Sequence, residues 1–145
     1  MPAIRPVLAA LVVVTALTLV AAPAEAQRSA RKAKSTEPQY DGRSLSSWVS
    51  DLKGAAPLTR TTAAYALAGM GPAAKPAVPA LIEALGDEIS AVRFPVAYAL
   101  GEIGEGAAEA VPALEKLLDD RNDDIAHIAR KSLKKITGKE YAPVE

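Results

Sequence analysis

Arg60-Thr-Thr-Ala-Ala-Tyr-Ala-Leu67 returns further along the chain as Arg93-Phe-Pro-Val-Ala-Tyr-Ala-Leu100. A second pair of segments repeats at the same interval: residues 78–85 read Val-Pro-Ala-Leu-Ile-Glu-Ala-Leu, and residues 111–118 read Val-Pro-Ala-Leu-Glu-Lys-Leu-Leu. We call this interval, from Arg60 to Arg93, one period. A fixed period of this length is typical of architectures in which short helical units stack on their neighbours. Because the apolar spacing within each segment is that of a helix with one buried face, the sequence predicts an all-α solenoid.

The same register continues on both sides of these two copies. Trp48 lies one period before Leu81, and its helix reads as an incomplete first copy with Trp48 in the core. In the last copy, Arg130 and Lys131 take the places of Ala97 and Tyr98. A more polar final copy is what the end of a solenoid requires, because no further repeat covers it.

We expect about six helices in three antiparallel pairs. Ser44 and Ser90 are expected to cap helices, and Gly71 and Gly104 to end them. The predicted helices cover residues 44–53, 58–70, 76–85, 90–103, 110–118 and 125–136. The predicted core contains Val78, Leu81, Leu85, Val96, Leu100, Ile103, Val111, Leu114 and Leu118.

The chain divides by composition into four parts. Residues 1–26 resemble a secretory signal peptide, with Arg5 before an apolar run and Ala24-Glu-Ala26 as the cleavage pattern. Residues 27–40 are polar and basic and predict a disordered linker. Residues 41–137 hold the repeats, and residues 138–145 form a tail. The chain is thus expected to be exported, to the periplasm or the extracellular space. The alternative is anchoring to the cytoplasmic membrane by residues 7–22.

Composition excludes several classes of site. The chain has no cysteine, so it forms no disulfide and no thiolate metal site. His127 is the only histidine, and the formal net charge is zero, so neither a multi-histidine metal centre nor nucleic-acid binding is expected. Residues 120–124 open like a calcium loop, but Ile125 and Lys131 stand where that loop needs glycine and glutamate. We therefore expect no cofactor.

The Arg-x-x-Ala-x-x-Ala-Leu helix, the Met70-Gly or Ile103-Gly break and the Val-Pro-Ala-Leu helix resemble short bacterial HEAT-like repeats, of the class named after phycobilisome lyases. The resemblance covers residues 44–137. Asp87 followed by Arg93 resembles the Asp-to-Arg pairing that this family forms between repeats. Stacked helix pairs give an extended surface and no enclosed pocket, so we expect a non-enzymatic scaffold that binds a protein partner.

Two surfaces are candidates for that partner. One is the face formed by the second helix of each repeat, which the family resemblance implies is concave; the other is a strip formed by Tyr65 and Tyr98, which share a repeat slot. Residues 61–129 hold eleven acidic and four basic side chains, so the helix face is expected to be negative and the partner to present basic or hydrogen-bonding groups. The candidate residues on this face are Glu83, Asp87, Glu88, Glu115, Lys116, Asp119 and Asp120.

These observations favour a protein-binding adaptor of the bacterial cell envelope. One alternative is a purely structural subunit of a larger envelope assembly. A second is a chromophore lyase-like enzyme, which only the name of the family class suggests. Membrane contact is expected only through an uncleaved N-terminal segment or the basic linker, which has four basic residues within 28–34.

Overall fold

A computed structural model of the chain describes residues 36–142. The predicted signal peptide and most of the predicted linker lie outside these residues. The described part is mostly helical, as the periodicity predicts. Its α-helices are α2 (Leu45–Leu52), α3 (Pro57–Met70), α4 (Val78–Ala84), α5 (Ser90–Ile103), α6 (Val111–Lys116) and α7 (Asp123–Thr137). Three 3₁₀ segments accompany them: η1 (Gly71–Ala77), η2 (Gly104–Ala110) and η3 (Leu117–Asp119). None of the helices in the described range is long and apolar enough to cross a membrane.

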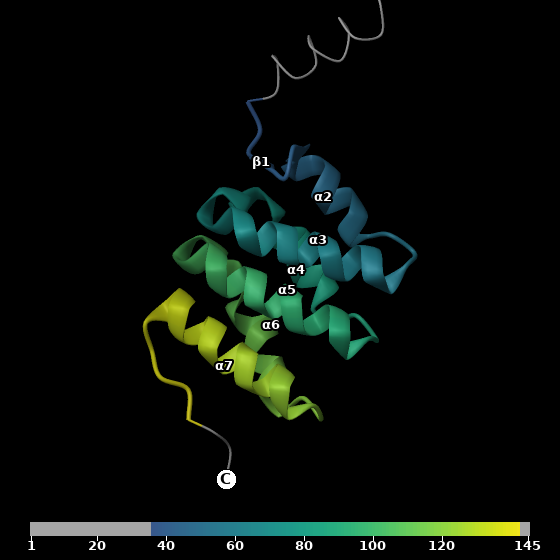
Figure 1. The fold of residues 1–145 in the computed structure, drawn as a ribbon. Coiled ribbons are helices and arrows are strands. Elements are labelled where there is room, and N and C mark those ends of the chain that lie inside the picture. The colour runs from purple at the N-terminus through teal and green to yellow at the C-terminus, as the bar shows by residue number, and fades with distance from the viewer. Residues whose placement is uncertain (1–35, 143–145) are drawn as a thin grey trace, which may run out of the picture. The chain divides into compact units, whose positions relative to one another are not determined.

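The helices pack as hairpins that stack on one another. Each hairpin consists of a short helix and the long helix that follows it. The three hairpins are α2 with α3, α4 with α5, and α6 with α7. The long helices α3, α5 and α7 lie side by side in one layer (Figure 1). Successive units in the stack therefore contact only their neighbours, which is the arrangement of a repeat solenoid.

Glycine ends the first two long helices where the sequence predicts. Gly71 follows α3 with φ of 56°, and Gly104 follows α5 with φ of 70°. L-residues with a side chain rarely adopt this left-handed region, so glycine is the residue that allows the chain to leave the helix there. In both copies the chain then enters a 3₁₀ segment that leads into the next short helix.

One predicted cap is confirmed and one is wrong. The Ser44 side chain accepts a hydrogen bond from the amide of Ser47 at the start of α2. Ser90, in contrast, is already inside α5, and the residue before it makes no side-chain cap. The carboxylate of Asp87 makes the turn instead, because it accepts a hydrogen bond from the Ile89 amide at 3.0 Å.

A proline inside α5 is accommodated by the neighbouring helix. Pro95 has no amide proton, so the carbonyl of Ala91 loses the helical donor four residues on. The hydroxyl of Thr61 on α3 donates to that Ala91 carbonyl at 3.2 Å. The contact between α3 and α5 therefore supplies a hydrogen bond that α5 cannot make within itself.

Most of the predicted core is buried, and the exceptions lie at its edge. Seven of the nine predicted positions are buried, and Leu81, Leu100 and Leu114 are fully so. Val111 and Leu118 are only half-buried. They belong to the last short helix and its 3₁₀ extension, beyond which no further short helix follows within the described residues to cover them.

The N-terminal end of the stack contains a small β-hairpin that the sequence analysis did not predict. Strand β1 (Gln39–Tyr40) pairs antiparallel with β2 (Arg43–Ser44), so the end of the expected linker is a strand. The Tyr40 ring packs directly over Gly69 of α3, where a Cβ atom would lie 2.5 Å from the ring. Trp48 is buried, as predicted, and its ring nitrogen donates to the Tyr40 carbonyl at 3.1 Å.

We predict that Leu81→Ala lowers the free energy of unfolding by about 2–5 kcal/mol, because it removes most of a fully buried side chain and leaves a cavity in the core. Leu118→Ala is the matched control. Its side chain is only half-buried, so the loss is expected to be smaller. Chemical denaturation followed by circular dichroism measures both, and equal losses would contradict the packing described here.

Candidate functional site

Two arginine side chains connect successive hairpins through their loops. Arg60, at the start of α3, forms two hydrogen bonds with the Asp87 carboxylate, at 2.6 and 3.2 Å. One repeat later, Arg93 bonds the Asp120 carboxylate in the same way, at 3.1 Å for both contacts. Each arginine therefore binds one carboxylate in a bidentate way and forms a clamp that connects its own hairpin to the loop that follows. We call these four residues the arginine ladder.

Each arginine also closes the loop that precedes it. The Nη1 atom of Arg60 donates to the carbonyls of Gly54 and Ala55, at 3.0 and 2.9 Å. Arg93 donates in the same way to the main-chain carbonyls of Asp87 and Glu88. Because these contacts use donors that are directed at the protein's own backbone, the arginines serve the fold and are not positioned to capture a ligand.

The predicted partner of one arginine is wrong. The sequence suggested a pair between Asp87 and Arg93, which are close along the chain. In the structure the Asp87 carboxylate binds Arg60, and Arg93 contacts only the main-chain oxygen of Asp87. The ladder does not extend further in either direction, because the residues it needs are replaced. Gly54 stands in the aspartate slot of the first loop, and Ala126 stands in the arginine slot of α7.

The ladder holds both of its carboxylates in the charged form. The hydrogen bond from Arg60 is the main cause that lowers the pKa of Asp87, and the Ile89 amide adds to it against the effect of burial. For Asp120, burial raises the pKa, but the bonds from the Asn122 amide and Arg93 outweigh it, and the pKa is lowered overall. The side chains of Asp87 and Asp120 are each only 10% exposed. Both carboxylates are therefore used for contacts within the stack.

The remaining candidates on the second-helix face are exposed, but their charges are mixed. Glu83 forms an ion pair with Lys53 at 2.9 Å, and the Tyr141 hydroxyl approaches Glu115 at 3.4 Å. The other predicted residues on this face are exposed, and their side chains form no ion pair or hydrogen bond within residues 36–142: Glu88, Lys116 and Asp119. A shallow hollow of about 210 Å³ lies between α2 and α4, with Lys53, Glu83 and Asp87 in its lining. The acidic excess of this part of the sequence is thus partly neutralised in space.

The two tyrosines of the predicted strip are not equally accessible. Tyr65 on α3 is 48% exposed, whereas Tyr98 on α5 is half-buried. The ammonium of Lys135 on α7 lies 6.0 Å from the centre of the Tyr98 ring. Because α7 places a side chain over the second tyrosine, the strip is open at one end only.

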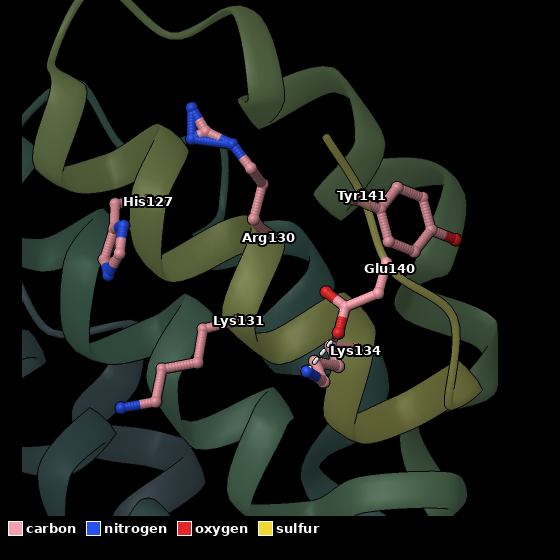
Figure 2. Close-up of a pocket in the computed structure, with 6 residues that line it drawn as sticks. All are labelled: His127, Arg130, Lys131, Lys134, Glu140 and Tyr141. Atoms are coloured by element: carbon pink, nitrogen blue, oxygen red, sulfur yellow. Dashed lines mark hydrogen bonds and ion pairs between the residues drawn. The ribbon is translucent and has the colours of Figure 1, made fainter. Parts of the chain in front are cut away.

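An open groove on α7 was not found by sequence reasoning. Its volume is about 420 Å³, and it is lined by His127, Arg130, Lys131, Lys134, Glu140 and Tyr141 (Figure 2). The first four side chains come from the outer side of α7, and the last two from the tail that folds back beside it. Lys134 forms an ion pair with Glu140. The replacement of Ala97 by Arg130 one repeat later was a signal for this groove, but only the fold shows that the tail returns to it.

Within residues 36–142, no group of three or more potential metal-binding side chains converges. A family model described as HEAT repeats matches residues 45–134. The match begins at the first residue of α2 and ends inside α7, so it spans all three hairpins and both clamps of the ladder. No curated protein matches the chain.

We predict that the arginine ladder makes stability depend on pH in the acidic range. Because the folded-state pKa values of Asp87 and Asp120 lie below the ordinary value of 3.8, the ladder contributes stability above that pH and loses it as the pH falls through the folded-state values. Asp87→Asn with Asp120→Asn should therefore lose less stability than the unaltered chain between about pH 6 and about pH 3.

Glu88→Gln with Asp119→Asn is the control for this prediction. It removes the same number of charges from exposed positions, and it should keep the pH dependence of the unaltered chain. Thermal unfolding across the pH range measures all three proteins. An identical pH dependence for the two double variants would show that the ladder does not hold its carboxylates as described.

Proposed function

The chain belongs to the HEAT-repeat family, and from this we propose that it is a non-enzymatic adaptor that binds protein partners in the bacterial cell envelope. HEAT repeats generally serve as scaffolds for protein interaction. The observation that carries the proposal is the stack itself: it exposes the outer sides of α2, α4 and α6, and the hollow between α2 and α4 is open and small. Enzyme sites usually enclose most of their ligand.

The finer family likeness, to short bacterial HEAT-like repeats of the phycobilisome-lyase type, supports the scaffold and not the chemistry. A lyase needs a pocket with several polar groups that converge on a reacting atom. The polar groups of the arginine ladder, which connect the loops of the stack, are already bonded to one another and to the backbone. Because these groups are already in use, we favour the adaptor over the lyase, and a purely structural subunit is the alternative.

The contact surface that we propose is the second-helix face. Small side chains at Ala80 and Ala84 border its hollow, so a partner's backbone is able to approach closely. Glu83 and Glu115 lie on successive short helices, near the ends of α4 and α6. A partner that presents basic or hydrogen-bonding groups fits this face, and Glu88, Lys116 and Asp119 extend it. If this face fails, Tyr65 with Tyr98 is the next surface to test.

Export is the second part of the proposal. It is supported by the pattern of residues 1–26, where a positive start, an apolar run and a small-x-small cleavage pattern follow one another. The run from residue 7 to residue 22 is shorter than the roughly 20 residues that a spanning helix needs. Cleavage would free the repeats beyond the cytoplasmic membrane, with the basic stretch 28–34 near the new N-terminus as a site of contact with anionic surfaces.

We predict that charge reversal on the second-helix face weakens partner binding. Affinity capture from an envelope extract identifies proteins retained by the chain, and titration of a purified candidate then gives its affinity. Glu83→Lys with Glu115→Lys should weaken binding by about tenfold or more, and the affinity of the unaltered chain should fall as salt rises. Glu105→Lys with Glu109→Lys, which makes the same change at exposed positions on η2, is the control. Equal affinity for all three proteins would exclude this face.

We predict that export removes residues 1–26. Mass spectrometry of the protein recovered outside the cytoplasmic membrane should give an N-terminus at Gln27. Recovery of the intact chain only from membranes would instead support the anchor formed by residues 7–22.

A further inference from the structure

The groove on α7 occupies the position at which each earlier repeat receives the next one. On α3 the side that faces α5 carries Thr61, Ala64 and Ala68, and the equivalent slots two periods later are His127, Arg130 and Lys134. Ala64 is fully buried against the neighbouring unit. The packing surface for a following repeat is therefore present in the last copy, but its small residues have been replaced by long cationic ones.

The composition of this surface exceeds what an end cap requires. A cap needs polar side chains of any sign to stay in water. Here Arg130, Lys131 and Lys134 are all basic. Within residues 36–142 neither Arg130 nor Lys131 forms an ion pair, and Lys134 is paired only with the chain's own tail. Three of the four lysine and arginine side chains of α7 therefore line the hollow, and the fourth, Lys135, is paired with Glu102 of α5.

The tail shows what chemistry the groove accepts. Glu140 lines it with a carboxylate that is 77% exposed and that forms an ion pair with Lys134, and Tyr141 lines the same hollow (Figure 2). The tail reaches the groove without helical structure, since α7 is capped by Gly138 and residues 139–142 form no regular element. A short irregular segment with a carboxylate beside an aromatic ring thus already lies in the groove.

We propose that the α7 groove binds an acidic, unstructured segment of a protein partner, and that the tail around Glu140 competes for the same place. Arg130 and Lys131 supply the positive charge that the tail leaves unused, and Lys134 is shared between tail and partner. The groove meets the second-helix face at one contact, where the Tyr141 hydroxyl donates to the Glu115 carboxylate. Arg130 and Lys131 lie outside that face, so this proposal is tested separately from the function proposed above. Together the two surfaces would let one small stack hold two different partners.

The proposal is tested with the full chain, as purified after expression, and a fluorescein-labelled oligoglutamate peptide, by fluorescence anisotropy at low and physiological salt. The peptide should bind, and an oligolysine peptide should not. Arg130→Gln with Lys131→Gln should weaken the oligoglutamate affinity about tenfold or more, because it removes two cations and leaves the pair between Lys134 and Glu140 in place. Lys75→Gln with Arg121→Gln, which removes two exposed cations outside both proposed surfaces, should leave the affinity within about twofold.

Glu140→Gln provides the sharper test, because removing the competing carboxylate should raise the oligoglutamate affinity by about 2- to 10-fold. Glu105→Gln makes the same change in net charge at an exposed position outside the groove and should not raise it. Far-UV circular dichroism confirms that each variant is folded. If Arg130→Gln with Lys131→Gln does not fold, the comparison of Glu140→Gln with Glu105→Gln decides alone.

Three results would overturn the proposal. The first is an oligoglutamate peptide that does not bind at low salt. The second is an equal affinity gain for Glu140→Gln and Glu105→Gln, which would mean that only net charge matters. The third is tighter binding of a single-stranded oligonucleotide of equal charge, which would mark a general polyanion surface in place of a site for acidic protein segments.

Discussion

A helical hairpin of this size cannot cover its own apolar side, and the structure follows from how closely its neighbours approach to cover it. Small residues set that approach. Gly101 on α5 lies so near α7 that a Cβ atom there would stand 2.5 Å from the Ser132 hydroxyl, which itself donates to the Ala97 carbonyl at 2.7 Å. At this separation the Arg93 side chain spans from its own loop to the next. A larger residue at Gly101 would force α5 and α7 apart.

Repetition explains which features the sequence predicts and which it does not. Helix positions, glycine stops and buried leucines recur once in every period, so each copy supports the interpretation of the others. The partner of Arg60 is less accessible, because it lies 27 residues away and only the stacked geometry brings Asp87 to it. The β-hairpin before α2 and the return of Glu140 to α7 occur once each, and neither has a periodic pattern to reveal it.

Net charge along a segment proves a weak guide to the charge of a surface. Residues 61–129 are strongly acidic in sequence, yet the structure assigns Asp87 and Asp120 to the ladder and Glu83 to Lys53. The side that α7 turns outward has the opposite sign, because the basic residues after residue 129 line up along one helix. The chain is neutral as a whole, but its two candidate contact surfaces differ in character.

The ladder also bears on how such a chain lengthens over evolutionary time. Its parts keep fixed spacings: an arginine, an aspartate 27 residues on, and the next arginine one full period after the first. A tandem gene duplication of one period would rebuild a complete clamp wherever within the period its breakpoints fell, because every slot returns in phase. A copy of either end unit would not stack in the same way. Gly54 lacks the carboxylate that a clamp needs, and Arg130 presents a charge to any new neighbour. The number of inner copies is therefore free to grow or shrink by whole units, while the first and last units act as the boundaries of the array.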